Sequence, residues 1–347
     1  MNIEEYNYFL PEDKIAQTPL SSRSNSKLLL MDKETGNLEE TIFKNITSYL
    51  KKGDCLVLND TKVIPARLIG EKADTKATIE LLLLRNITNN TWECLSRPFK
   101  RLHVGSIVSF GGGILKAKVT EKKKEGLVEV EFIYEGIFME ILEHLGTMPL
   151  PPYIHEQLQD NSRYQTVYAK HEGSAAAPTA GLHFTTELLE EIKKMGIEII
   201  YVTLHVGLGT FRPVEVTDIR EHHMHSEYYI LSEESAEKLN KAKREKRNIY
   251  AVGTTSTRVL ETIMQKHGEF IPTHGTTDIF IYPGYVFKAI DGLITNFHLP
   301  KSTLLMLVSA LSSKKNILNA YQYAIDHDFR FFSFGDAMFI KILSKND

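Results

Sequence analysis

The middle of the chain, residues 66–148, alternates apolar and polar positions over short stretches. Glycine, asparagine or lysine turns separate these stretches, which cover Ala66–Gly70, Thr78–Leu84, Thr91–Ser96, Ser106–Phe110, Ile114–Glu121 and Leu127–Tyr134. Alternation with a period of two indicates strands with one buried face, and evenly spaced short strands are typical of a small barrel. The pattern therefore predicts a β-barrel, closed by a short helix at about Ile137–Leu145.

Both flanks of this segment show a different pattern, in which compact apolar runs alternate with helical periodicity. Strands are expected at Leu28–Asp32, Cys55–Leu58, Ile197–His205, Ile249–Val252 and Leu293–Asn296. Helices are expected at Glu187–Met195, Glu233–Lys246, Arg258–His267 and Ser302–Ser312. Short buried strands separated by helices favour right-handed crossovers and parallel pairing.

The predicted fold class is therefore α/β, with one discontinuous domain built from both ends of the chain. Residues 1–65 and 149–347 form this α/β domain around a largely parallel sheet, and the barrel at residues 66–148 interrupts it. Pro149, Pro151 and Pro152 mark the return from the barrel, since clustered prolines favour a boundary.

Composition narrows the function classes. The 347 residues carry a net charge of −3, so no domain-wide basic field indicates nucleic acid, and an RNA site must be a local patch. The acidic start lacks the pattern of a signal peptide, and no apolar stretch approaches the roughly 20 residues of a membrane span. Cys55 and Cys94 suit reduced thiols. We expect a cytoplasmic monomer that does not bind membranes.

Five segments at predicted strand ends combine small residues with a polar or ionisable group. They are Asn59–Thr61, Ala175–Phe184, His205–Phe211, Gly253–Arg258 and Asn296–Pro300. Ligands of open α/β sheets bind beyond the carboxyl ends of the strands, so these segments are candidates for one shared site.

Each segment also has a plain structural interpretation. Gly253–Arg258 either caps a helix or grips an anion at a helix N-terminus, with Arg258 as a bidentate partner. Asp60 is either a positioned carboxylate or an Asx turn, and His183 and His298 are either structural or functional. Gly207 and Gly209 permit close approach of a flat ligand but lack the rest of a dinucleotide fingerprint.

Two further clusters of polar residues are candidates for a metal site and an RNA site. His222, His223, His225 and Glu227 could hold a metal, but the helical His-Glu-x-x-His arrangement is absent, so a structural or RNA-contacting role is favoured. Arg97, Lys100 and Arg101 follow Trp92 on the predicted barrel and precede His103. Interleaved basic and aromatic residues are typical of single-stranded RNA surfaces.

Taken together, the segments resemble the S-adenosylmethionine:tRNA ribosyltransferase-isomerase family of queuosine biosynthesis over almost the whole chain. The most specific block is Ala176-Ala177-Pro178-Thr179-Ala180-Gly181-Leu182-His183-Phe184-Thr185. Further matching blocks are Tyr8–Pro11, Gly53–Leu68, Pro149–Ile154, Arg163–Ala169, Val202–Phe211, Val252–Arg258, Ile294–Leu307 and Arg330–Met338. Ala175, where the family pattern has valine, is a mild departure that affects no catalytic group.

The resemblance implies an α/β domain interrupted by a β-barrel, and a transferase that consumes S-adenosylmethionine (AdoMet) as a ribosyl donor. The acceptor would be 7-aminomethyl-7-deazaguanine at the tRNA wobble position, and the products would be epoxyqueuosine-tRNA, adenine and methionine. No metal or redox cofactor is implied, because AdoMet is a consumed co-substrate. The partners would be AdoMet and tRNA.

On this basis we assign candidate roles. Asp60 is the base candidate, and His183 and His298 are the acid candidates. AdoMet would be lined by Thr179, Gly181, Phe184, His205, Gly207, Gly209, Thr210, Phe211, Gly253, Thr254, Thr255, Arg258, Asn296 and Phe297. RNA would be held by Arg97, Lys100, Arg101, Arg163, Tyr164 and Gln165. The alternatives are a non-catalytic tRNA-binding module and a metal-dependent hydrolase that uses the His222–Glu227 cluster.

Overall fold

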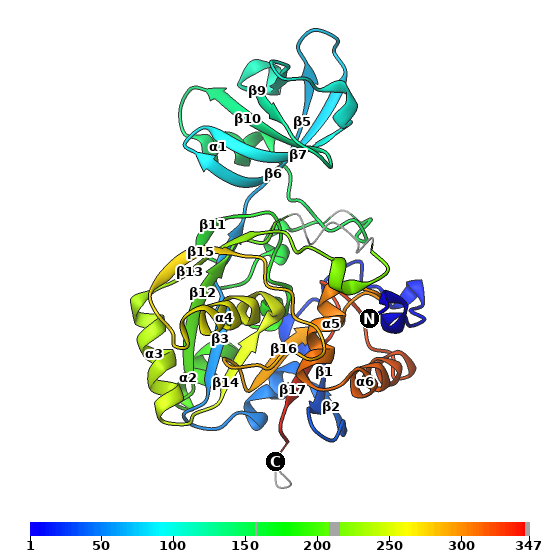
Figure 1. The fold of residues 1–347 in the computed structure, drawn as a ribbon, viewed down its shortest axis with the longest axis vertical. Coiled ribbons are helices and arrows are strands. Elements are labelled where there is room, and N and C mark those ends of the chain that lie inside the picture. Colours follow the sequence, from blue (N-terminus) through cyan, green and yellow to red (C-terminus); the bar gives the residue numbers. More distant parts are fainter. Residues whose placement is uncertain (157, 208–215, 344–347) are drawn as a thin grey trace.

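The structure is a computed structural model that describes residues 1–156, 158–207 and 216–343. An α/β domain holds both ends of the chain, and a barrel stands at one end of the molecule (Figure 1). None of the helices in the described ranges combines the length and apolar character needed to cross a bilayer.

Among the described residues the main sheet has nine strands, in the order β15-β13-β12-β3-β14-β16-β17-β1-β2. Their bounds are β1 Lys27–Asp32, β2 Leu38–Ile42, β3 Cys55–Asn59, β12 Glu198–Leu204, β13 Glu227–Leu231, β14 Ile249–Val252, β15 Thr273–Thr277, β16 Gly292–Asn296 and β17 Ala337–Lys341. A separate small sheet pairs β4 (Thr61–Val63) with β11 (His171–Ser174).

The centre of the main sheet is parallel. Strands β12, β3, β14 and β16 run in one direction, as do β17 and β1 in the other, whereas the remaining pairs are antiparallel. The carboxyl ends of β12, β3, β14 and β16 therefore lie along the same edge, which is where α/β sheets bind ligands.

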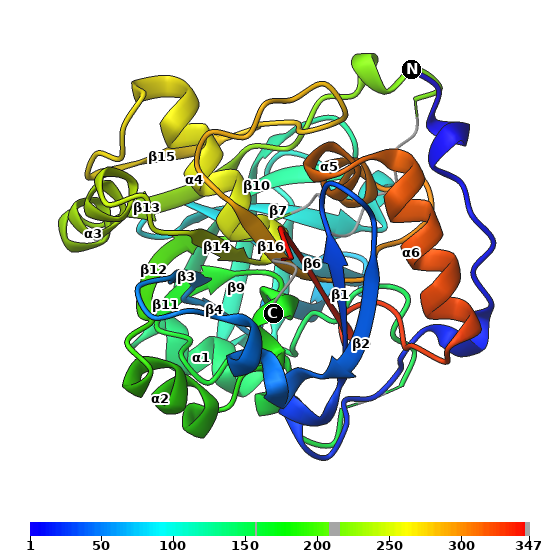
Figure 2. The same cartoon turned by 90° about the horizontal axis from the view of Figure 1, so that it is seen from below.

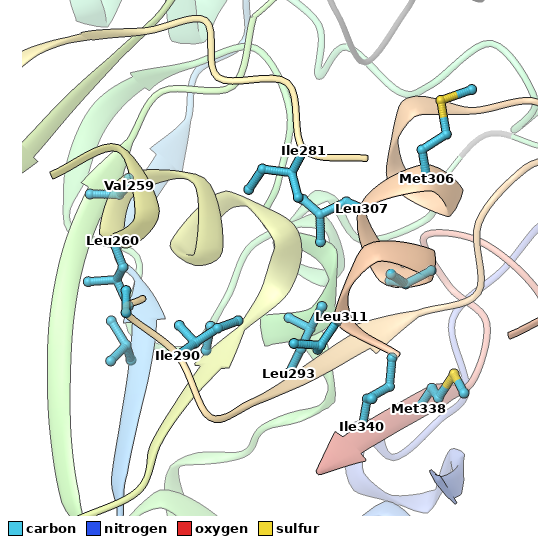
Figure 3. Close-up of a cluster of buried hydrophobic side chains, with 14 of the residues drawn as sticks. Val259, Leu260, Ile281, Ile290, Leu293, Met306, Leu307, Leu311, Met338 and Ile340 are labelled. Atoms are coloured by element: carbon cyan, nitrogen blue, oxygen red, sulfur yellow. The ribbon is translucent and has the colours of Figure 1, made fainter. Parts of the chain in front are cut away.

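Side chains alternate between two faces of the sheet, as the period of a strand requires. On β3, Cys55 and Val57 join one apolar cluster, and Leu56 and Leu58 join another. Helices α3 (Glu233–Arg244), α4 (Gly253–His267), α5 (Thr303–Leu311) and α6 (Lys314–Asp326) contribute to the first cluster, and α2 (Thr186–Lys194) with the 3-10 helix η4 (Phe43–Tyr49) to the second (Figure 2). Figure 3 shows the first cluster, where Leu260 of α4 and Leu311 of α5 pack near Leu293 of β16.

The barrel has its own apolar core. Its strands, all within the described residues, close in the order β10-β7-β6-β5-β8-β9. They are β5 Arg67–Lys72, β6 Thr78–Thr88, β7 Thr91–Arg97, β8 Ile107–Phe110, β9 Leu115–Lys122 and β10 Leu127–Tyr134, followed by α1 (Phe138–Leu145). The segments by which the chain enters and leaves the barrel lie side by side, since the Thr147 amide donates to the Arg67 carbonyl at 2.9 Å.

The predicted fold class is confirmed: a large sheet with helices on both faces accompanies a closed barrel. Strands β13, β15 and β17 were not predicted, and they make the sheet more mixed than the sequence indicates. Helix α4 starts at Gly253 rather than Arg258. Glycine and hydroxyl residues are weak helix formers, but the Ser256 and Thr257 hydroxyls donate to carbonyls four residues earlier, at 2.9 and 3.2 Å.

The carboxylate of Glu261 on α4 fastens the loop that precedes β16. It is fully buried and accepts hydrogen bonds from the amides of Lys288, Ala289 and Ile290 at 2.9–3.3 Å, and from the Tyr285 hydroxyl at 3.0 Å. Without it, several buried donors lose their partner, and each unpaired donor costs ~1–3 kcal/mol.

We therefore predict that Glu261→Ala lowers the free energy of unfolding by about 3 kcal/mol or more. Urea denaturation followed by circular dichroism measures this value. The matched control is Glu269→Ala, which removes an exposed carboxylate just beyond the same helix and should change stability by less than ~0.5 kcal/mol. Equal effects of the two substitutions would refute the fastening role of Glu261.

Candidate active site at the strand ends

The segments that the sequence predicts to form a site do lie side by side. Asp60 follows β3, His205 follows β12, Gly253 follows β14 and Phe297 follows β16, all at the shared edge. The segment Ala175–Phe184 crosses this edge and contacts three of them. The Ala175 amide donates to the Val206 carbonyl at 3.0 Å, and the Thr179 hydroxyl donates to the Asn296 side chain at 3.3 Å. Ala180 lies next to Gly253.

Asp60 is a buried carboxylate with identified partners. The Thr203 hydroxyl donates to its Oδ1 at 2.7 Å, and the His171 Nε2 lies 3.5 Å from its Oδ2. Burial raises the pKa of the Asp60 carboxyl above its ordinary value, against the opposing effects of the Thr203 hydrogen bond and the charges of His171 and Lys170. A carboxylate with a raised pKa is a suitable general base.

Three residues near Asp60 were missed by sequence reasoning. Thr203 lies inside β12, and His171 starts β11, which pairs with Thr61 directly after Asp60. Tyr168 lies against Gly181, because a Cβ on Gly181 would come within 2.0 Å of the Tyr168 hydroxyl oxygen. That hydroxyl is buried and has no partner among the described residues. Tyr168 and Thr203 lie within blocks that match the family, but nothing in the sequence assigns them to Asp60, since only the pairing of distant segments brings the three residues together.

His205 is held in the same corner. Its Nδ1 lies 2.8 Å from the Thr61 hydroxyl, and its ring stacks on Tyr228. Burial, and to a smaller extent the charge of His171, lowers the pKa of His205 to about 4. The imidazole is therefore neutral near pH 7.

His183 is a neutral, fully bonded imidazole. Its Nδ1 lies 2.7 Å from the Ser26 hydroxyl, and its Nε2 lies 3.2 Å from the Asn296 Nδ2. The Asn296 amide nitrogen can only donate, so Nε2 accepts and Nδ1 carries the proton. Burial, with the charges of Arg23 and Arg330, lowers the pKa of His183 to about 3. This arrangement argues against His183 as a proton donor and favours a positioning role.

His298 is also buried. Its Nε2 lies 2.9 Å from the Thr295 hydroxyl, and its backbone amide donates to the Tyr321 hydroxyl at 3.0 Å. Burial lowers the pKa of His298 to about 3. Burial therefore disfavours the charged imidazolium form of both acid candidates, His183 and His298.

Arg258 has a partner that the sequence did not predict. Its guanidinium forms a buried ion pair with Glu227 of β13, and the Glu227 carboxylate also accepts a hydrogen bond from the Gly207 amide at 2.9 Å. A substrate carboxylate would have to compete with Glu227 for this arginine. The Nε atom of Arg258 and the Thr255 hydroxyl are buried without partners in the described ranges, and Thr254 is buried beside them.

The pairing of Glu227 also removes the metal-site alternative. Among the described residues, no group of three histidine, cysteine, aspartate or glutamate side chains could hold a metal ion. His222 packs edge-on against Phe280, and burial lowers its pKa.

The aromatic candidates lie in the core. Phe184 packs edge-on against Phe43, and Phe297 packs against Tyr321, Phe329 and Phe331; both are fully buried. The prediction that Phe184 and Phe297 line AdoMet is therefore not supported. Gly209, Thr210 and Phe211 lie outside the described residues.

The RNA candidates divide into two groups. Arg97, Lys100 and Arg101 are exposed on the barrel, whereas Trp92 is buried in the barrel core against Phe138, so the expected aromatic surface is wrong there. On the α/β domain, Tyr164 is buried and Gln165 clamps the backbone of Val63 through bonds of 3.0 and 2.6 Å. Tyr164 and Gln165 thus have structural roles, and Arg163 remains half-buried.

The fold and this edge define a class: a two-domain α/β protein with a strand-end site and an inserted barrel. The family model of the queuosine biosynthesis protein matches residues 3–340, and the chain belongs to this family.

Relatives support the assignment over nearly the full length. The S-adenosylmethionine:tRNA ribosyltransferase-isomerases of Caldanaerobacter subterraneus and Staphylococcus haemolyticus are 58% and 59% identical to the chain, over 98% of it and 100% of each relative. A crystal structure of S-adenosylmethionine tRNA ribosyltransferase from Thermotoga maritima is 36% identical, covers 97% of this chain and 99% of its own, and has a TM-score of 0.56.

The neutral histidines predict a pH dependence of stability. The pKa values of His183 and His298 fall from 6.5 to about 3 on folding, so the unfolded chain binds more protons between these values. Their stabilisation is complete above about pH 6.5 and is lost as the pH falls toward 3, at up to ~1.4 kcal/mol per pH unit for each histidine.

His298→Gln should flatten this dependence, because glutamine does not titrate. Urea midpoints measured from pH 7.5 downwards test this, with the exposed His103→Gln as control. Equal slopes for the wild type and His298→Gln would show that His298 does not titrate as its burial predicts.

Proposed function

We propose that the protein is an S-adenosylmethionine:tRNA ribosyltransferase-isomerase. It transfers and isomerises the ribosyl group of AdoMet onto 7-aminomethyl-7-deazaguanine at the tRNA wobble position, and it releases adenine and methionine. The observation that carries the proposal is the buried Asp60 carboxylate at the edge where five polar segments meet. Relatives about 58% identical, with that name, support it.

The chemistry begins with proton removal. The sulfonium acidifies the C5′ hydrogens of AdoMet, and we assign Asp60 as the base that takes one of them. Its raised pKa makes it a stronger base than an exposed carboxylate, while the Thr203 hydroxyl and His171 orient its oxygens. A positioned base contributes ~10²–10⁴-fold to the rate.

The remaining steps follow from the charge on the substrate. Electrons released at C5′ expel adenine, which needs a proton, and the amine of the wobble base attacks the unsaturated sugar. Rearrangement then expels methionine and leaves an epoxide. We propose that His183 and Asn296 orient the substrate, because the neutral His183 imidazole is poorly suited to protonate adenine. The reaction uses AdoMet as a consumed co-substrate and needs no resident cofactor.

We further expect the enzyme to act as a cytoplasmic monomer, with tRNA reaching the exposed Arg97, Lys100 and Arg101 of the barrel. The alternative of a non-catalytic tRNA-binding module predicts tRNA binding without AdoMet binding or adenine release.

Asp60→Asn should abolish adenine release while AdoMet still binds. The loss should be ~10²–10⁴-fold, because asparagine keeps the shape of the side chain and cannot accept the proton. Single-turnover adenine release and calorimetric binding of AdoMet measure the two quantities separately. Near-normal turnover in this variant would remove Asp60 from the mechanism.

Thr203→Val should move the acid limb of the rate–pH profile to higher pH. The lost hydroxyl stabilises the ionised Asp60, so its removal raises the pKa of the base, which must be deprotonated to act. Thr203→Ser keeps the donor and is the matched control. An unchanged limb in Thr203→Val would mean that the titrating group in the profile is not Asp60.

A further inference from the structure

Two of three neighbouring half-buried arginines line a small cavity beside His183. Arg23 and Arg163 line this cavity together with Ser26 and Ser333. Arg330 lies close by, since its charge and that of Arg23 both act on His183. The three side chains come from segments far apart in the sequence, so only the fold assembles them.

Backbone carbonyls, rather than carboxylates, hold the three guanidinium groups. Arg23 donates to the carbonyls of Ser162 and Leu182 at 2.9 and 3.3 Å, and Arg163 donates to those of Leu20 and Ser21 at 2.7 and 3.3 Å. Arg330 donates to the carbonyl of Thr18. These bonds fix the directions of the side chains. The charges of Asp160 and Asp336 act on Arg23 and Arg330, but neither carboxylate forms an ion pair with them.

No ion pair joins any of the three arginines to a carboxylate in the described part of the chain. The two nearby carboxylates bind backbone amides instead of guanidinium groups. Asp160 accepts from the Ser162 amide at 2.9 Å, and Asp336 accepts from the Lys27 and Arg330 amides, each at 2.7 Å. Half-buried guanidinium groups that have no carboxylate in direct contact favour a bound anion.

Two guanidinium nitrogens of these arginines also lack an acceptor among the described residues. The Nε of Arg163 and an Nη of Arg330 are buried and find no acceptor within the described ranges. Buried donors without partners call for an explanation, and a bound anion provides one. The planar guanidinium fork fits the oxygens of a carboxylate or a phosphate.

We propose that Arg23, Arg163 and Arg330 form an oxyanion site that binds a negatively charged group of the substrate. The site is at the same edge as Asp60: Ser26 precedes β1 and contacts His183, which contacts Asn296 at the end of β16. The bound oxyanion is either the carboxylate of the methionyl group of AdoMet or a phosphate of tRNA. The source of the anion follows from the proposed function, whereas the inference that the site binds an anion does not depend on it.

The first test measures anion binding without turnover. Inorganic phosphate, compared with chloride at equal ionic strength, should raise the thermal midpoint of the wild-type full-length protein and of Arg220→Gln. Arg220 carries the same charge on the surface, paired with Asp218, and serves as the matched control. Arg163→Gln should abolish the rise. If phosphate leaves the wild-type midpoint unchanged, or raises it equally in Arg163→Gln, the site does not exist.

The second test identifies the source of the anion. Loss of one charge-assisted contact should weaken substrate binding roughly 10- to 100-fold. If the AdoMet carboxylate is bound, Arg163→Gln weakens binding of AdoMet and has no effect on decarboxylated AdoMet. If a tRNA phosphate is bound, Arg163→Gln raises the KM for tRNA and lowers its salt dependence, and the affinity for AdoMet stays the same.

A purely structural role is distinguished by Arg163→Lys. Lysine keeps the charge but loses the fork, so substrate binding should recover only in part if an oxyanion is held. Unchanged affinity for both substrates in a folded Arg163→Gln would overturn the proposal. The arginines would then only hold the backbone carbonyls that they contact. Absence of adenine release by the wild type would instead refute the proposed function, while phosphate binding could still be present.

Discussion

The whole strand-end site depends on how the side chain of Asn59 ties two neighbouring strands together where they end. Its amide donates to the Leu204 carbonyl at 3.0 Å, and its carbonyl oxygen accepts from the amides of Leu204 and Thr61 at 3.0 and 3.2 Å. These bonds take the place of ladder bonds where β3 gives way to β4. Because Asn59 is fully buried, any loosening would leave several backbone groups unpaired, so the positions of Asp60 and His205 are tightly fixed.

Beyond this fixed corner, several separate polar contacts lie along the sheet edge. Asp60 contacts Thr203, Thr61 contacts His205, and Asn296 links Thr179 to His183. Each buried polar group in this set has a partner, which is the condition under which such a network makes a site rigid. The barrel adds none of these groups. Its contribution is the exposed basic group of Arg97, Lys100 and Arg101.

The sequence predicted the strands of the barrel closely, because each has one face in a core and one in water, and the alternation is therefore visible. It predicted the edge of the site equally well, since residues directly after a buried strand have a fixed location. Contacts between distant segments could not be predicted from the sequence. Glu227 forms an ion pair with Arg258 of another element, and the pairing of β11 brings His171 close to Asp60. The burial of Phe184 and Phe297 was missed because a phenylalanine outside a regular strand has no periodic pattern that shows whether it faces the core.

The distribution of charge along the edge fits the proposed substrate better than a uniform field would. AdoMet carries a positive sulfonium and a negative carboxylate, and its acceptor carries phosphates. Imidazolium groups beside the sulfonium would repel it, and burial keeps His183, His205 and His298 neutral. In the proposed site the carboxylate of Asp60 would attract the sulfonium, while Arg23 and Arg163 line a cavity beside His183. The pKa of Tyr168, raised well above 10 mainly by burial, responds to the charges of both Asp60 and Arg23. A net charge of −3 for the chain is therefore compatible with a site that binds both signs of charge, because separation within the edge, rather than the total, decides what it binds.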